Sequence, residues 1–73
     1  MSVVSVRFEE YEYYDIARDR DTLRLEAITN LGTFHADVDA NAGVAALRRA
    51  FATYVYESLA LGHAPHEVNI GGH

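Results

Sequence analysis

The spacing of apolar residues changes once along this 73-residue chain. From about residue 3 to residue 38, apolar and polar residues alternate in three runs separated by polar turns, which is typical of half-buried strands. From about residue 41 to residue 61, apolar residues recur at spacings of three and four, which is typical of a helix. The sequence therefore predicts a single α+β domain over residues 1–73: a three-stranded antiparallel meander followed by one long helix packed on the sheet (βββα).

The first run contains a change of phase. Its apolar positions are even up to residue 8 and odd afterwards: Val4, Val6 and Phe8, then Tyr11 and Tyr13. Strict alternation would bury Glu10 and Glu12, and an unpaired buried carboxylate is strongly unfavourable. A one-residue bulge at residues 9–10 would restore the phase. We therefore expect a bulge there, with both tyrosines inside and with Glu12 and Tyr14 outside.

The next two runs predict a hairpin. Strands over about residues 22–28 and 33–38 would be joined by a loop over residues 29–32, in which Gly32 takes the left-handed conformation. This loop sets inward residues opposite one another: Leu23, Leu25 and Ala27 against Val38, Ala36 and Phe34. On the outer face it brings opposite charges together: Arg24 with Asp37, and Glu26 with His35.

The helix is predicted from an apolar stripe at helical spacing: Val44, Leu47, Phe51, Val55 and Leu59. Asp39 or Asn41 would cap its start, and Gly62 would follow its end. At about 1.5 Å per residue the helix would be about 30 Å long. A six-residue strand measures only about 20 Å, so one end of the helix should overhang the sheet, or a partner should cover it. A second apolar flank predicts a homodimer interface: Ala45, Ala52 and Tyr56.

The remaining residues predict a turn and a short tail. Residues 63–66 surround a proline and should form a turn. Residues 67–70 allow a short fourth strand, with Val68 and Ile70 directed inward. Residues 71–73 should be frayed, as chain ends usually are.

The composition limits the partners of the protein. The net charge is −5, and all six basic residues are arginine. An acidic surface opposes direct binding to nucleic acid or to an anionic membrane, and it favours partners with basic surfaces. The absence of cysteine fits a reducing compartment. We find no secretory signal at the N-terminus and no apolar run near the length of a membrane span, so we expect a cytoplasmic protein.

Acidic and tyrosine residues are concentrated between residues 9 and 21. We predict a partner-binding surface from them: Glu9, Glu10, Glu12, Tyr14, Asp15, Asp19 and Asp21. Charge on an edge strand can also serve only to prevent aggregation. The functional alternative is an acidic surface that binds a basic protein, since exposed tyrosine beside charge is typical of interfaces.

Catalytic and metal-binding patterns are weak in this sequence. His63 and His66 form a His-x-x-His pair, but two ligands are too few for a metal site. No nucleophile motif or phosphate-binding loop is present. We therefore expect no enzyme, no metal and no cofactor. The sequence favours a non-enzymatic protein-binding module, in its sharpest form a phage-type inhibitor that mimics nucleic acid, as anti-CRISPR proteins do. The alternative is a small structural or accessory subunit, homodimeric or docked through its helix.

Overall fold

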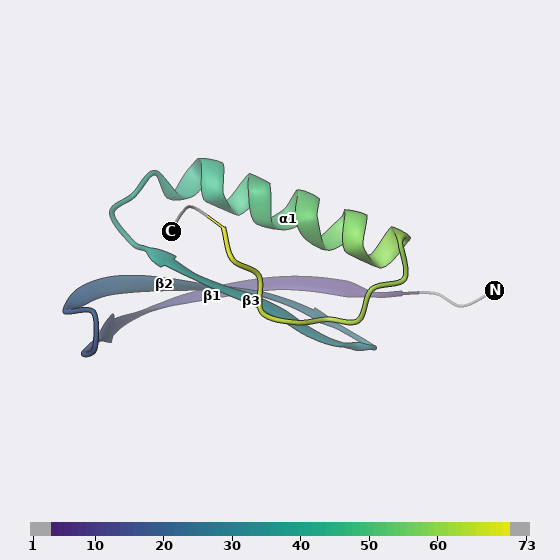
Figure 1. The fold of residues 1–73 in the computed structure, drawn as a ribbon, viewed down its shortest axis with the longest axis horizontal. Coiled ribbons are helices and arrows are strands. Elements are labelled where there is room, and N and C mark those ends of the chain that lie inside the picture. Colours follow the sequence, from purple (N-terminus) through teal and green to yellow (C-terminus); the bar gives the residue numbers. More distant parts are fainter. Residues whose placement is uncertain (1–3, 71–73) are drawn as a thin grey trace.

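A computed structural model describes residues 4–70 of the chain. Three antiparallel strands form one open sheet in the order β1-β2-β3, and one helix packs on a single face of it (Figure 1). The elements are β1 (Val6–Asp15), β2 (Arg20–Thr29), β3 (Gly32–Asp39) and α1 (Val44–Ala60). The predicted βββα architecture is confirmed.

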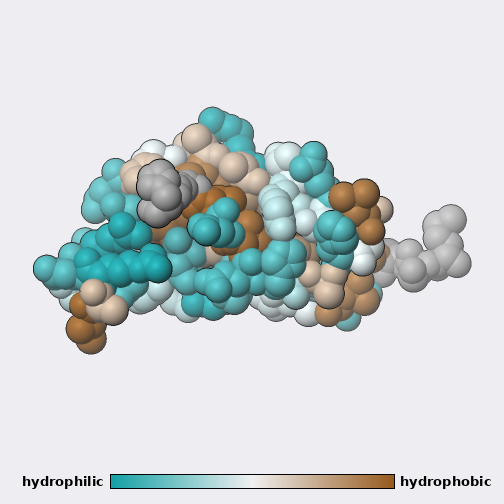
Figure 2. All heavy atoms as spheres, viewed as in Figure 1, coloured by the Kyte–Doolittle hydropathy of each residue, from teal (hydrophilic) through white to brown (hydrophobic). Residues whose placement is uncertain are grey.

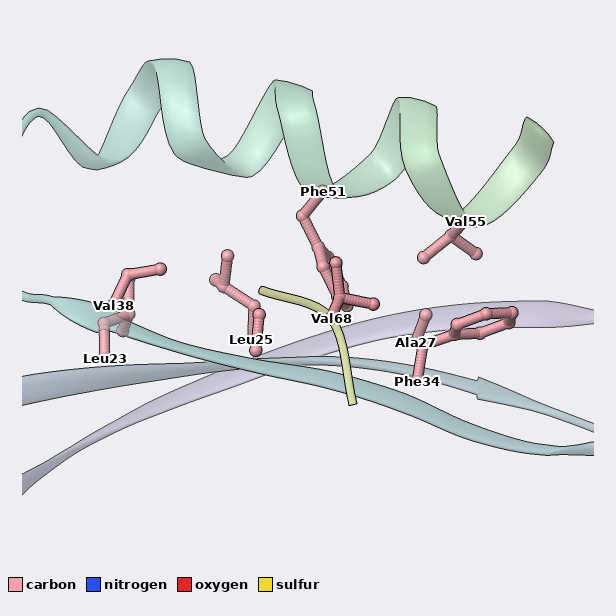
Figure 3. Packing of buried hydrophobic residues seen from close by; sticks show 9 residues of the cluster. Leu23, Leu25, Ala27, Phe34, Val38, Phe51, Val55 and Val68 are labelled. Atoms are coloured by element: carbon pink, nitrogen blue, oxygen red, sulfur yellow. The ribbon is translucent and has the colours of Figure 1, made fainter. Parts of the chain in front are cut away.

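The core lies between α1 and the two strands nearest to it, β2 and β3 (Figure 3). Its buried residues are Leu23, Leu25, Ala27, Phe34, Ala36, Val38, Phe51, Val55 and Val68. The helical stripe predicted from the sequence is confirmed: Phe51 and Val55 are fully buried, and the other three members are partly buried against them. Burial of this stripe is what holds the helix on the sheet, because apolar surface removed from water is the main stabilising term.

The β2–β3 hairpin has the predicted register. Ala27 lies opposite Phe34, and every inward and outward pair agrees with the expectation. The ladder extends one pair further than expected, to Thr29 and Gly32, so the turn contains only Asn30 and Leu31. Gly32 has a φ of 135°, a conformation that favours glycine.

The predicted bulge in β1 is wrong. The ladder between β1 and β2 runs without interruption from Val6 opposite Thr29 to Asp15 opposite Arg20. Even-numbered residues of β1 therefore face the helix, and odd-numbered residues, including both tyrosines expected inside, face the other way. The physical reason is that β1 is an edge strand and the helix backbone lies over β2 and β3. Carboxylates on its helix side stay in contact with water, so no burial penalty forces a bulge.

The two ends of the helix differ in how well they were predicted. The N-cap is Gly43, with a φ of 68°, and neither Asp39 nor Asn41 occupies that position. Asp39 instead accepts a hydrogen bond from the Asn41 amide at 2.9 Å and closes the turn before the helix. At the C-terminus, the His63 and Gly62 amides donate to the carbonyls of Ser58 and Leu59. This is a Schellman motif, and Gly62 (φ 77°) has its predicted role.

The sheet extends beyond the helix, whereas the sequence predicted that the helix would extend beyond the sheet. β1 and β2 each contain ten residues, which corresponds to about 33 Å, whereas the 17 residues of α1 correspond to about 25 Å. The β1–β2 hairpin therefore projects beyond the start of the helix (Figure 1). The strands were predicted too short, and it is the sheet that overhangs.

The tail runs along β3, but within residues 4–70 it does not form the fourth strand that the sequence allowed. It makes one parallel bridge, between His35 and Glu67. Val68 points into the core and is buried, as predicted, while Ile70 is partly buried. The fraying expected for residues 71–73 lies outside the described residues.

Candidate binding surface

The acidic cluster of the sequence is divided between the two faces of the sheet. Glu9 lies on the outer face, opposite Glu26 of β2, whereas Glu10 and Glu12 lie on the helix side. Alternation along an uninterrupted strand causes this division, because successive side chains point to opposite faces. The seven predicted partner-binding residues therefore do not form one surface.

Arginines neutralise three of these carboxylates. Glu9 pairs with Arg7 at 3.0 Å, and Asp15 lies 3.9 Å from the Arg18 guanidinium. The remaining pair is Glu10 with Arg48, described next. Each pair removes a negative charge from the surface that a partner would meet.

Arg48 joins the helix to the edge strand. Its Nε and one terminal nitrogen donate to the two Glu10 carboxylate oxygens at 2.8 and 2.6 Å. The hydrogen bonds from Arg48 hold the pKa of the Glu10 carboxyl below its usual value, although partial desolvation opposes this. The pair is bidentate, which is the strongest geometry for an arginine and a carboxylate. It explains how a carboxylate facing the helix is accommodated.

Three carboxylates of the hairpin remain unpaired. Within residues 4–70, no arginine or histidine nitrogen lies within 4.0 Å of Glu12, Asp19 or Asp21. Tyr14 lies on the helix side of the sheet directly across from Asp21 and two residues after Glu12, and it is 54% exposed. We call these four residues, Glu12, Tyr14, Asp19 and Asp21, the hairpin patch.

The hairpin patch lies toward the end of the sheet that projects beyond the helix, with Glu12 opposite Leu23 and the other three residues nearer the turn. Asp19 is in the turn, where its φ of 53° is unusual for a residue other than glycine. The same turn contains Ile16, which is 85% exposed. Figure 2 shows this end of the molecule as hydrophilic with a hydrophobic group at the tip. The projecting hairpin thus presents unpaired negative charge beside one aromatic and one aliphatic side chain.

The outer face of the sheet is organised around Arg24. Its guanidinium lies 3.4 Å from Asp37 and 3.6 Å from Glu26, so the cross-strand pairing predicted from the sequence is present. The Tyr13 hydroxyl donates to Asp37 at 3.2 Å. Desolvation raises the pKa of this hydroxyl, and the negative charge of Asp37 raises it further. Tyr13 was expected in the core; it instead orders a polar network.

An aromatic contact connects β1 to the helix. The Phe8 ring packs edge-on against Phe51 at 6.3 Å and Tyr56 at 5.8 Å between centroids. Phe8 is 41% exposed and Tyr56 57% exposed. A hollow of about 160 Å³ beside this contact is lined by Phe8, Glu9, Glu10, Leu25, Glu26, Arg48, Phe51 and Ala52.

The residues predicted for a dimer interface lie in different surroundings. Tyr56 packs on Phe8, Ala52 lines the hollow, and Ala45 is exposed. The second flank of the helix therefore faces the open side of β1. A homodimer through this flank stays a prediction.

His66 and His35 lie in different surroundings. His66 Nδ1–H donates to the Ala64 carbonyl at 2.8 Å, so in the neutral ring Nε2 accepts from the Tyr54 hydroxyl at 2.7 Å. One ring nitrogen is therefore engaged within the tail, and the other by the Tyr54 hydroxyl of the helix. His35 lies opposite Glu26, as predicted. Tyr54 is 36% exposed.

A different set of side chains could hold a metal ion. One ligand atom from each of His35, Asp37 and Glu67 lies within 4.8 Å of the other two. Sequence reasoning missed this set because Glu67 reaches the sheet only through the path of the tail. The available signal was the His-x-Asp spacing, which places two ligands on one face of a strand.

No family model, curated protein or solved structure matches this chain. Among residues 4–70, no helix combines the length and the apolar character needed to cross a bilayer. The geometry of the described residues is therefore the basis for any functional assignment.

Proposed function

We propose that this chain is a non-enzymatic protein-binding module whose projecting β1–β2 hairpin docks onto a basic surface of another protein. The observation that carries the proposal is the hairpin patch: three carboxylates without a cationic partner, placed around an exposed tyrosine. Elsewhere on this hairpin, arginines already neutralise the carboxylates. An unpaired acidic and aromatic surface on a projecting element is suited to a basic partner, because charge guides association and a buried tyrosine slows dissociation.

The sharper form of this proposal is an inhibitor that occludes a nucleic-acid-binding surface, in the manner of a phage-type, anti-CRISPR-like protein. The confined size of the hairpin patch supports docking on a local basic site better than imitation of a long phosphate backbone, because interspersed arginines interrupt the negative charge. The absence of cysteine supports action in the cytoplasm. The mechanism is steric occlusion, with no chemical step.

Site-specific photocrosslinking tests the proposal. A crosslinking amino acid replaces Tyr14 in one version and Thr53, on the exposed side of the helix, in the control. Capture of a cell protein from position 14 and not from position 53, with loss of capture as salt rises, is the expected result. Equal capture from both positions would count against the hairpin patch.

Binding kinetics with the captured protein then separate charge from packing. Changing Glu12→Gln, Asp19→Asn and Asp21→Asn together should slow association and flatten its salt dependence, since exposed charges are screened over about 8–10 Å. A control with the same change in net charge is Glu9→Gln, Glu26→Gln and Glu57→Gln, away from the patch. Tyr14→Ala should speed dissociation. The proposal fails if the control triple slows association as much as the patch triple.

A second candidate function is an accessory subunit that assembles through the open side of β1. The observation that favours it is the partly exposed pair of Phe8 and Tyr56 beside an unpaired sheet edge, since such edges readily accept a further strand. In the homodimeric form, light scattering should give about twice the 8.1 kDa chain mass. Tyr56→Glu should return the protein to the monomer and Thr53→Glu should not. A monomer across the micromolar range would exclude this form.

A further inference from the structure

The tail is attached to the edge of β3 through His35. The His35 amide donates to the His66 carbonyl at 3.4 Å, and the Val68 amide donates to the His35 carbonyl at 2.7 Å. These two bonds fix Glu67 directly beside His35. Burial of Val68 in the core holds the same segment from its other side.

Three metal-ligating side chains converge at this attachment. Asp37 follows His35 by two residues in β3 and lies on the same face, and Glu67 comes from the tail. His35 Nε2 lies 3.9 Å from a Glu67 carboxylate oxygen, and the three ligand atoms lie within 4.8 Å of one another. Ligand atoms around a tetrahedral zinc ion with bonds of about 2.0–2.1 Å are about 3.3 Å apart. Small side-chain rotations would close this difference, because the Glu67 side chain is 71% exposed.

The surroundings of the three ligands resemble a supporting shell. Asp37 accepts hydrogen bonds from the Tyr13 hydroxyl at 3.2 Å and from Arg24 at 3.4 Å, one on each carboxylate oxygen. Hydrogen bonds of this kind orient the carboxylates that bind metals. Arg24 also lies 3.6 Å from Glu26, which balances its charge. The two ligand carboxylates therefore carry a net charge of about −2, which a divalent ion neutralises.

Open space adjoins the ligands on the side of the tail. A hollow of about 310 Å³ is lined by Tyr13, Asp15, Arg18, Asp37, Glu67, Val68 and Asn69. It leaves room for water in the coordination positions that the protein does not fill. One imidazole with two carboxylates is a donor set suited to zinc and related divalent transition ions, rather than to magnesium.

We propose that His35, Asp37 and Glu67 bind a zinc ion that fastens the tail to β3. A small domain without disulfides is commonly supported by a metal, and this site joins His35 to Glu67, which is 32 residues further along the chain. The role is structural, and it is independent of the function proposed for the hairpin patch. It also replaces the sequence-based expectation that the protein has no metal site.

Zinc titration of the purified full chain by calorimetry tests this site. We expect one zinc ion per chain. Glu67→Gln or His35→Gln should weaken zinc binding by at least about tenfold. Tyr13→Phe should also weaken it by about tenfold, because the Tyr13 hydroxyl donates a hydrogen bond to the ligand Asp37. His63→Gln is the matched control and should leave the affinity unchanged. Loss of binding in the control with retention in Glu67→Gln would overturn the proposal, as would equal affinity for magnesium.

Two further measurements keep the proposal testable if a variant folds poorly. In wild-type protein, zinc should shift the amide NMR signals of residues 33–39 and 66–69, and leave those of the hairpin patch in place. Zinc should also raise the melting temperature of the wild type and not that of Glu67→Gln, because a ligand that binds only the folded state stabilises it. Shifts centred on His63, or a melting temperature unaffected by zinc, would show that the three ligands do not form a site.

Discussion

Replacing Phe51 with alanine is the most direct test of the core. The Phe51 ring is 2% exposed and makes an edge-on contact with Phe8. Phenylalanine-to-alanine changes in cores cost about 3–5 kcal/mol. At about 0.05–0.15 kcal/mol per residue, a domain of 73 residues has a total stability of about 4–11 kcal/mol. The variant should therefore lose about a quarter or more of its stability, and it should be partly unfolded at 37 °C if the stability of the protein lies at the low end of this range.

Urea unfolding followed by circular dichroism measures this loss. The matched control is Thr53→Ala, an exposed position on the same helix, where the change should stay within about 0.5 kcal/mol. The hollow beside Phe51 opens to solvent, so water can enter the space left by the ring. A loss of at least about 3 kcal/mol should lower the melting temperature by at least about 12 °C. A Phe51→Ala variant with the same melting temperature as Thr53→Ala would refute the packing of the helix on β2 and β3.

Three further changes test other parts of the fold. The pKa of Glu10 is lowered in the folded state, so its pair with Arg48 stabilises the fold above the unfolded pKa, near 4.5, and this effect is lost as the pH falls through the folded pKa. The difference in melting temperature between wild type and Glu10→Gln should therefore shrink below about pH 4.5. A difference that stays constant from pH 3 to 7 would contradict the pair. Gly62→Ala should cost about 1 kcal/mol in urea unfolding, because its φ of 77° is unfavourable for alanine while its surroundings are open. Gly32→Ala should cost more than Gly62→Ala, because a Cβ there would also lie 3.3 Å from Pro65; the reverse order would contradict the close approach of the tail.

Local chemistry was sufficient to predict the middle of the chain. Gly32 and the matching of opposite charges fixed the register of β2 and β3, because the other loops set inward residues opposite outward ones, or like charges opposite each other. The helical stripe and Gly62 predicted α1 and its end for the same reason: spacing and backbone conformation are properties of neighbouring residues.

The edge strand could not be predicted in this way. Whether Glu10 is costly on the helix side depends on how far the helix extends across the sheet, which is a tertiary property. The side chain that accommodates it, Arg48, is 38 residues away. The same reason separates the carboxylates into paired and unpaired groups, and so the hairpin patch required the structure. Glu67 beside His35 likewise depends on the path of the tail.

The position of β1 at the margin of the sheet has a consequence for how the molecule opens. The fully buried core is formed by residues of β2, β3 and α1 together with Val68. β1 is attached by its ladder to β2, by the contact of Phe8 with Phe51 and by the pair of Glu10 with Arg48. Detachment of β1 therefore leaves the core in place, and we expect its amides to exchange with deuterium faster than those of β3. When β1 detaches, it exposes the edge of β2 with which it pairs. The β1 strand of a second copy of the protein can pair with that edge equally well. Concentrated protein should thus form strand-exchanged dimers that retain every core contact of the monomer.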